Sequence, residues 1–139
     1  MIIYMDENMP GHLAEGFHII QFPESIKTQY VIEVKFLPSR FGCGAQDVDW
    51  LPVVGSEGSC IITQDKKLSK RKSEIELYKK HKVGIFFMRG PSKKQGLKIW
   101  DMTQALAKNW DEICRIAKED TRPFGYVFKL KGKMERLEL

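Results

Sequence analysis

The chain has 139 residues, of which 42% are hydrophobic, and it carries a formal net charge of +5. This length fits one domain of ordinary size, and the composition is sufficient to bury a real core. Three cysteines without a CxxC spacing argue against a disulfide framework or a zinc cage, and no apolar run is long enough to span a bilayer, so we expect a cytoplasmic protein with no membrane partner.

The charge is distributed unevenly along the chain. Residues 1–62 hold eight acidic and three basic side chains, whereas residues 64–98 hold three acidic and twelve basic ones. An acidic segment followed by a strongly basic one suits an enzyme that holds a metal ion at one place and a phosphate backbone close by.

The N-terminal third predicts a strand, a helix and a second strand. The apolar run 2–5 is typical of a buried strand, and Pro10 then stands in the first turn of a helix that buries Phe17. Residues 21–29 show no clear period and are interpreted as a loop. A second strand is predicted at 30–36.

The middle of the chain predicts a loop, a helix and a third strand. Residues 38–46 are rich in proline, serine and glycine, which is typical of a loop. A helix that starts near Asp47 should turn Trp50 and Val54 toward the core. The third strand is predicted at 59–63.

Another helix and a fourth strand follow a run of basic residues. Ser73 is predicted to be the N-cap of this helix, with Glu76 three residues later as the partner in a capping box. The helix should end near His81. The nearly all-apolar run 83–88 is then typical of a buried parallel strand.

The C-terminal part predicts a long helix and a hairpin. The helix should cover about 97–119, with Trp100 and Trp110 in an apolar stripe that packs on the sheet. The runs 124–130 and 134–137 predict a terminal β-hairpin. Strands and helices alternate up to this point, which predicts an α/β protein with a parallel, three-layer α/β/α arrangement.

Acidic residues recur at places that such a sheet brings together. The three acidic stretches are Asp6-Glu7-Asn8, Asp47-Val48-Asp49 and Thr63-Gln64-Asp65. The first and the last follow predicted strands, and the carboxyl ends of parallel strands meet at the edge where ligands bind. Two carboxylates about 4 Å apart repel by roughly 4 kcal/mol at an effective dielectric near 20. A divalent cation offsets this repulsion, so the pattern predicts an oxygen-ligand Mg²⁺ or Mn²⁺ site.

Basic residues lie next to the last of these acids. Six of them are predicted to contact the phosphates of a nucleic acid: Lys66, Lys67, Lys70, Arg71, Lys72 and Arg89. A solvated helix-start face is the alternative interpretation of the run at 66–72, and the sequence leaves both open.

Four motifs of this chain, taken in order, resemble those of a PIN-like domain. They are Asp6-Glu7-Asn8-Met9-Pro10, Gly44-Ala45-Gln46-Asp47-Val48-Asp49-Trp50-Leu51, Ile61-Ile62-Thr63-Gln64-Asp65 and Val83-Gly84-Ile85-Phe86-Phe87-Met88. Each is short, and the specificity comes from their order, spacing and position at strand ends. The branch that they resemble is the small single-domain group related to VapC-type toxins.

The resemblance implies a Rossmann-like, three-layer α/β/α PIN-like domain over residues 1–120, with a parallel central sheet. Residues 121–139 would form a C-terminal β-hairpin appended to the same domain. The implied activity is that of a Mg²⁺- or Mn²⁺-dependent endoribonuclease that cleaves single-stranded RNA as the toxin of a toxin–antitoxin pair. The implied partners are the RNA, an antitoxin protein and a second copy in a homodimer.

The resemblance also assigns site residues by their place in the motifs. The acids Asp6, Asp47 and Asp65 match the catalytic, metal-binding positions. Glu7 and Asp49 are further acids that could complete the metal shell. Thr63 and Asn8 are the supporting polar residues. The acid that better-known PIN domains carry later, after the T-x-D motif, has no equivalent at Lys66, Lys67 or Leu68.

Two rival functions remain open from the sequence. The missing late acid favours a non-catalytic module that binds nucleic acid or a protein partner through a degenerate metal site. A receiver-like phosphoacceptor domain also combines strand-end acids with a threonine and a lysine, although the order of the acids fits it poorly. Calorimetric titration with Mn²⁺ separates the enzyme from the module, and labelling with acetyl phosphate tests the receiver.

Overall fold

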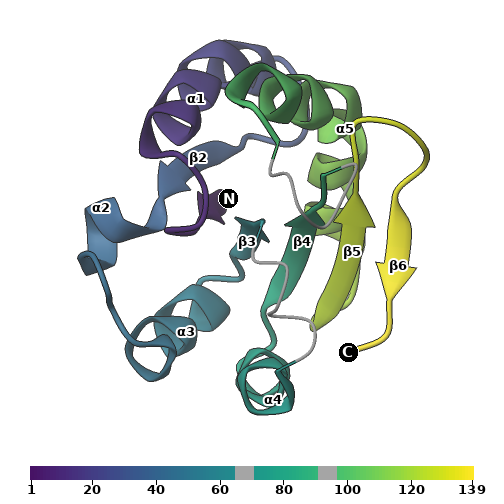
Figure 1. Cartoon of the computed structure of the whole chain (residues 1–139). Helices are drawn as coiled ribbons and strands as arrows, with labels where there is room; N and C mark the ends of the chain where they lie inside the picture. The colour runs from purple at the N-terminus through teal and green to yellow at the C-terminus, as the bar shows by residue number, and fades with distance from the viewer. Residues whose placement is uncertain (65–70, 91–96) are drawn as a thin grey trace.

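A central sheet organises the computed structural model, which describes residues 1–64, 71–90 and 97–139 (Figure 1). Within these residues the sheet has six strands in the order β2-β1-β3-β4-β5-β6. The strands are β1 (Ile2–Met5), β2 (Glu33–Phe36), β3 (Cys60–Thr63), β4 (Gly84–Met88), β5 (Phe124–Phe128) and β6 (Glu135–Leu137). All neighbouring pairs are parallel except β5 and β6, so the predicted parallel central sheet is confirmed.

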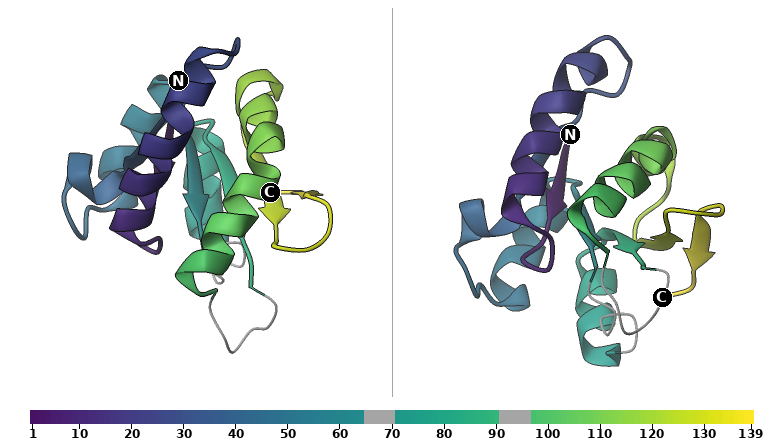
Figure 2. Two further views of the ribbon diagram at one scale, coloured as in Figure 1. Left: turned by 90° about the horizontal axis from the view of Figure 1, so that it is seen from above. Right: turned by 45° about the horizontal axis from the view of Figure 1, so that its top comes forward.

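Helices cover both faces of the sheet. They are α1 (Gly11–Ile26), α2 (Leu37–Phe41), α3 (Asp47–Ser56), α4 (Lys72–Lys80) and α5 (Ile99–Glu119). Figures 1 and 2 show α1 and α5 on one face and α3 and α4 on the other, with the short α2 beyond β2. The predicted three-layer α/β/α architecture is therefore confirmed.

Strand alternation divides the apolar residues between two cores. Ile3 and Met5 of β1 face α1 and α5, whereas Tyr4 between them faces α3. In β3, Ile62 and Ile61 divide in the same way. Because both faces are covered, these strands need apolar side chains at every position, which explains why they were recognisable as continuous apolar runs.

The strand order creates a crevice at one edge of the sheet. The chain leaves β1 through α1 to reach β2 on one side, and it returns through α3 to β3 on the other side of β1. The β1–β2 connection therefore covers one face of the sheet and the β2–β3 connection covers the other, so the connections diverge at the boundary between β1 and β3. In open α/β sheets ligands bind at such a switch point, outside the carboxyl ends of the strands.

The first helix is longer than the sequence indicates. It continues to Ile26, through the segment 21–29 that we interpreted as a loop. The inward positions there are the polar residues Gln21 and Ser25, which hides the apolar period. The amide of Gln21 donates a hydrogen bond of 2.7 Å to the carbonyl oxygen of Ile32, so polar contacts hold the end of the helix against the chain before β2.

The segment after the first helix also differs from its prediction. β2 begins at Glu33, three residues later than expected, and the short helix α2, which starts at Leu37, occupies the first part of the predicted loop 38–46. Within α2, Arg40 pairs with Glu57 and contacts the hydroxyl of Tyr4. This network joins α2 to β1 and to the end of α3.

The start of α4 and the C-terminal hairpin need smaller corrections. Arg71, and not Ser73, is the N-cap of α4, and no side chain caps the helix. The predicted hairpin forms, but β5 pairs in parallel with β4 and continues the central sheet. Phe124 and Phe128 at its ends are buried, so this strand belongs to the core.

The exposure of Trp100 contradicts its prediction as a core residue. Its side chain is 75% exposed, because the buried stripe of α5 passes through Met102, Leu106 and Ile113. At about 100° per residue, Trp100 lies on nearly the opposite side of the helix from Met102. Trp110 is half-buried. Its ring packs edge-on against that of Phe17, with 4.7 Å between the ring centroids.

Candidate metal centre

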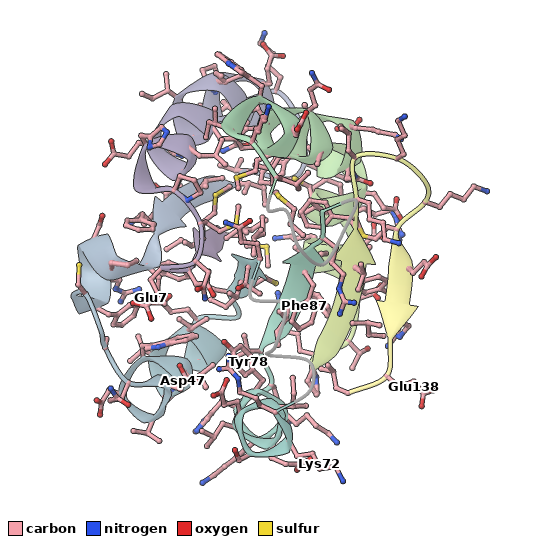
Figure 3. The ribbon with its side chains drawn as sticks, in the orientation of Figure 1. Glu7, Asp47, Lys72, Tyr78, Phe87 and Glu138 are labelled. Atoms are coloured by element: carbon pink, nitrogen blue, oxygen red, sulfur yellow. The ribbon has the colours of Figure 1, made fainter. Side chains whose placement is uncertain are left out.

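An acidic cavity opens at the switch point between β1 and β3. It has a volume of about 490 Å³, and its walls come from the β1–α1 connection, the α2–α3 connection, α3 and α4. Figure 3 shows Glu7, Asp47 and Tyr78, which come from three of these walls. The charged residues among its described lining are Asp6, Glu7, Asp47, Glu74 and Arg71.

Asp6 follows β1 directly and is held in a fixed orientation. Only 7% of its surface is exposed. The backbone N–H of Asn8 donates to its Oδ1 at 3.1 Å, and the Asn8 amide donates to its Oδ2 at 3.4 Å. These contacts fix a carboxylate at the mouth of the crevice, in the position that the sequence predicted.

The end of β3 lies directly beside Asp6. The backbone N–H of Asp6 donates to the carbonyl oxygen of Ile62 at 3.2 Å, and the Gln64 amide donates to the carbonyl oxygen of Asn8. Thr63 is fully buried at the end of β3 and is not part of the cavity wall. The two strand ends on which the sequence pattern depends are therefore bonded to each other.

Asp47 reaches the same cavity from the first turn of α3. Burial raises the pKa of its carboxyl above the ordinary value, the charges of Glu74 and Glu7 raise it further, and Arg71 and a hydrogen bond from the Trp50 indole oppose this. Glu7, Asp47 and Glu74 thus come from three elements and line the same cavity. Trp50 itself is 3% exposed, so the prediction that it packs in the core is confirmed.

This raised pKa should give the metal-free protein a pH-dependent stability. Ionising the Asp47 carboxyl costs more free energy in the folded than in the unfolded chain. This loss of folding stability is absent below the ordinary pKa near 3.8, and it grows as the pH rises through the raised pKa. Asp47→Asn should therefore gain stability relative to wild type between about pH 4 and neutrality. Urea unfolding in EDTA across this range measures it, with Asp49→Asn as the charge-matched control. A constant difference between wild type and Asp47→Asn would contradict the expectation.

Glu74 and Arg71 form the wall on the side of α4. The guanidinium of Arg71 pairs with the carboxylate of Glu74 at 2.9 Å. Glu74 is an acid of the cavity that our sequence interpretation missed. The signal was its place in the first turn of the helix after Asp65, where an acid also has the common role of stabilising a helix N-terminus.

The remaining predicted site residues fall into two groups. Asp49 is exposed on α3, Lys72 is exposed at the start of α4, and Arg89 is half-buried after β4; none of these three lines the cavity. The predicted residues Asp65, Lys66, Lys67 and Lys70 lie outside the residues that the structure describes.

The donor set matches the chemistry of a hard divalent cation. Carboxylate oxygens and a neighbouring amide are the ligands that Mg²⁺ and Mn²⁺ prefer, and the cavity offers no described cysteine or histidine. Within residues 1–64, 71–90 and 97–139, no group of three side chains from aspartate, glutamate, histidine or cysteine lies close enough together to hold a metal ion. The described acids alone thus give a partial ligand set.

Comparison with known families identifies the fold. A family model described as a PIN-like domain matches residues 1–90. The chain belongs to the PIN-like domain family. The match includes all the described residues of the acidic cavity, from Asp6 to Tyr78. PIN-like domains are typically nucleases, which are hydrolases. No curated protein and no solved structure matches the chain.

None of the helices that the structure describes combines the length and the apolar character that a membrane crossing requires.

Proposed function

We propose that this PIN-like domain is a metal-dependent ribonuclease that cleaves single-stranded RNA. The observation that supports this most is the convergence of Asp6 and Asp47, 41 positions apart in the sequence, on one acidic cavity at the switch point of the sheet. Burial and the charges of Glu74 and Glu7 make ionisation of Asp47 costly without a cation, which favours a binding role for this cavity over a structural one.

Three acids would hold the ion: Asp6, Asp47 and Asp65, the last because it stands two residues after β3. Bound Mg²⁺ or Mn²⁺ would supply an activated water and a counter-charge for the phosphate in hydrolysis. Glu74 lies in the same cavity and could act as the late acid whose absence the sequence suggested.

The other residues of the cavity have roles that follow from their contacts. Asn8 orients the Asp6 carboxylate through two hydrogen bonds. Arg71 places a positive charge beside Asp47 and Glu74, and it could bind a phosphate oxygen of the substrate. Leu37, Trp50 and Leu77 give the cavity an apolar wall, which strengthens the electrostatic interactions inside it.

The direct test is cleavage by the purified protein. With a fluorescently labelled single-stranded RNA we expect cleavage in Mg²⁺ or Mn²⁺ and none in EDTA. Calorimetry should show Mn²⁺ binding, and a metal concentration 100 times the dissociation constant should stabilise the fold by about 2.7 kcal/mol. Binding of Mn²⁺ without cleavage in either metal would contradict the nuclease proposal.

The role of a toxin held by an antitoxin is the narrower part of this proposal. It is supported by the resemblance of the four motifs to the VapC-related branch. Expression of the chain in bacteria should arrest growth, and expression of Asp6→Asn should not. Normal growth with the wild-type chain, at the same protein level, would argue against a toxin while leaving the nuclease chemistry in place.

A non-catalytic binding module is the second candidate. The absence of a late acid at Lys66, Lys67 and Leu68 in the sequence favours it. Such a module would bind RNA equally well with and without divalent metal, and calorimetry would show at most weak Mn²⁺ binding. The two candidates therefore differ in metal dependence, which one pair of titrations resolves.

A further inference from the structure

One tryptophan of this chain faces solvent. The side chain of Trp100 is 75% exposed, whereas Trp50 is 3% exposed and Trp110 is half-buried against Phe17. An indole is a large apolar surface to leave in water. A single exposed apolar side chain is ordinary on a protein surface, so its position and surroundings decide whether it has a role.

Trp100 lies at the same edge of the sheet as the acidic cavity. It is the second residue of α5, and α5 follows β4, so the helix begins near the carboxyl end of that strand. Figure 2 shows the first turns of α5 beyond the sheet edge toward which the parallel strands point. β1, which ends directly before Asp6, and β4 are two strand spacings apart, or about 10 Å along the edge.

The side chains that flank Trp100 are polar and include exposed lysines. Lys98, the N-cap of α5, and Gln104 and Lys108 on the helix are exposed, and the adjacent Asp101 is partly buried. The Lys108 ammonium group donates to the carbonyl oxygen of Leu130 at 3.1 Å, which ties the β5–β6 turn to the helix.

The β5–β6 turn adds to this positive charge. It begins at the carboxyl end of β5, and it carries three exposed lysines: Lys129, Lys131 and Lys133. The buried amide of Asn109 donates to the carbonyl oxygen of Lys129 at 3.1 Å, a second contact that holds the turn against α5. Helix α5 and this turn thus supply five exposed lysines, which we call the basic surface: Lys98, Lys108, Lys129, Lys131 and Lys133.

An isolated aromatic ring among cations fits a nucleobase better than a protein partner. Protein interfaces bury clusters of apolar residues around a central anchor. The other large exposed hydrophobic side chains of the described residues lie elsewhere: Ile19, Ile20 and Ile26 on α1, Val31 before β2 and Val48 on α3. A base needs only one flat ring, together with cations for its phosphates.

We propose that Trp100 stacks on a base of single-stranded RNA, whose backbone runs from the acidic cavity along the sheet edge to the basic surface. This deepens the proposed function, on which it rests, because it defines where the substrate lies outside the cleavage site. Stacking requires unpaired bases, so Trp100 would also make the protein select single strands over duplex RNA.

The test measures binding without cleavage. Labelled single-stranded RNA is titrated in EDTA by fluorescence anisotropy against wild type, Trp100→Ala and Trp100→Phe. Loss of one stacking contact weakens binding by about tenfold, since such contacts contribute roughly 1–3 kcal/mol each. We expect this loss for Trp100→Ala and near-wild-type binding for Trp100→Phe. Ile20→Ala is the matched control, because Ile20 is 67% exposed but lies on α1.

A second probe distinguishes stacking from a general loss of affinity. On an RNA that carries abasic sites, wild type and Trp100→Ala should bind equally, because no base is present to stack. RNA should also quench the fluorescence of the wild-type protein more than that of Trp100→Ala.

The proposal is overturned if Trp100→Ala binds intact RNA as well as wild type does, if it weakens binding to abasic RNA equally, or if the wild type binds no single-stranded RNA. Since EDTA prevents metal-dependent cleavage, a protein that never cleaves RNA can still pass this test. In that case the proposed catalytic function fails and the stacking site stands.

Discussion

Asp6→Asn should lower metal-dependent cleavage of single-stranded RNA at least about 100-fold. Even residues that only support metal ligands typically change affinity or activity by about 10- to 100-fold when mutated, so loss of a ligand should cost at least as much. The substitution conserves shape, and the asparagine oxygen can still accept the 3.1 Å hydrogen bond from the Asn8 backbone. Folding should therefore survive while Mn²⁺ binding is lost.

Asp49→Asn is the matched control for this prediction. It removes the same charge from an exposed position on α3 that does not line the cavity. Cleavage rates at saturating RNA, together with Mn²⁺ calorimetry, compare the three proteins. Retention of wild-type activity by Asp6→Asn, or an equal loss in Asp49→Asn, would remove the acidic cavity as the catalytic site.

Gly55→Ala should destabilise the protein more than the same change at the other glycines of the described helices, Gly11 and Gly16. A Cβ atom at Gly55 would lie 2.1 Å from the carbonyl oxygen of His81, which belongs to the backbone and cannot rotate away. Overpacking of this kind costs about 3 kcal/mol, and α3 must move to relieve it. Because Asp47 lies on the same helix, we also expect weaker Mn²⁺ binding in the fraction that folds.

Gly16→Ala provides the control on α1. Apart from the adjoining backbone of α1 itself, no atom lies within 4 Å of the position its Cβ would take, so the substitution should be neutral or should stabilise the protein by up to about 1 kcal/mol. Urea unfolding measures both variants. Equal stability of Gly55→Ala and wild type would mean that α3 does not pack as closely on the α4–β4 connection as described.

The sheet and half of the candidate site could be predicted from the sequence for the same physical reason. Strands buried on both faces need unbroken apolar runs, and the residues that follow them must lie at one edge. The strand Ile2–Met5 and the position of Asp6 after it could therefore be predicted, and so could the helix that begins at Asp47.

The errors arose where polar contacts replace apolar periodicity. The end of α1 was missed because Gln21 and Ser25 face inward and bond to the carbonyl oxygen of Ile32. Trp100 was assigned to the core because it is apolar and close in sequence to the buried residues of α5. Its position around the helix axis nevertheless directs it to solvent.

Glu74 illustrates a different kind of miss. An acid in the first turn of a helix has an ordinary local explanation in the helix dipole. Only the packing of α4 beside α3 brings Glu74 close enough to Asp47 to raise its pKa.

The short strand β6 has a consequence for the behaviour of the whole chain in concentrated solution. It pairs antiparallel with β5 and exposes Glu135 and Arg136 to solvent. The edge strand on this side of the sheet is therefore short and carries two charged residues. Without it, the backbone groups of β5, flanked by Phe124 and Phe128, would be open to strands of other molecules. We therefore expect removal of β6 to promote fibril-like self-association.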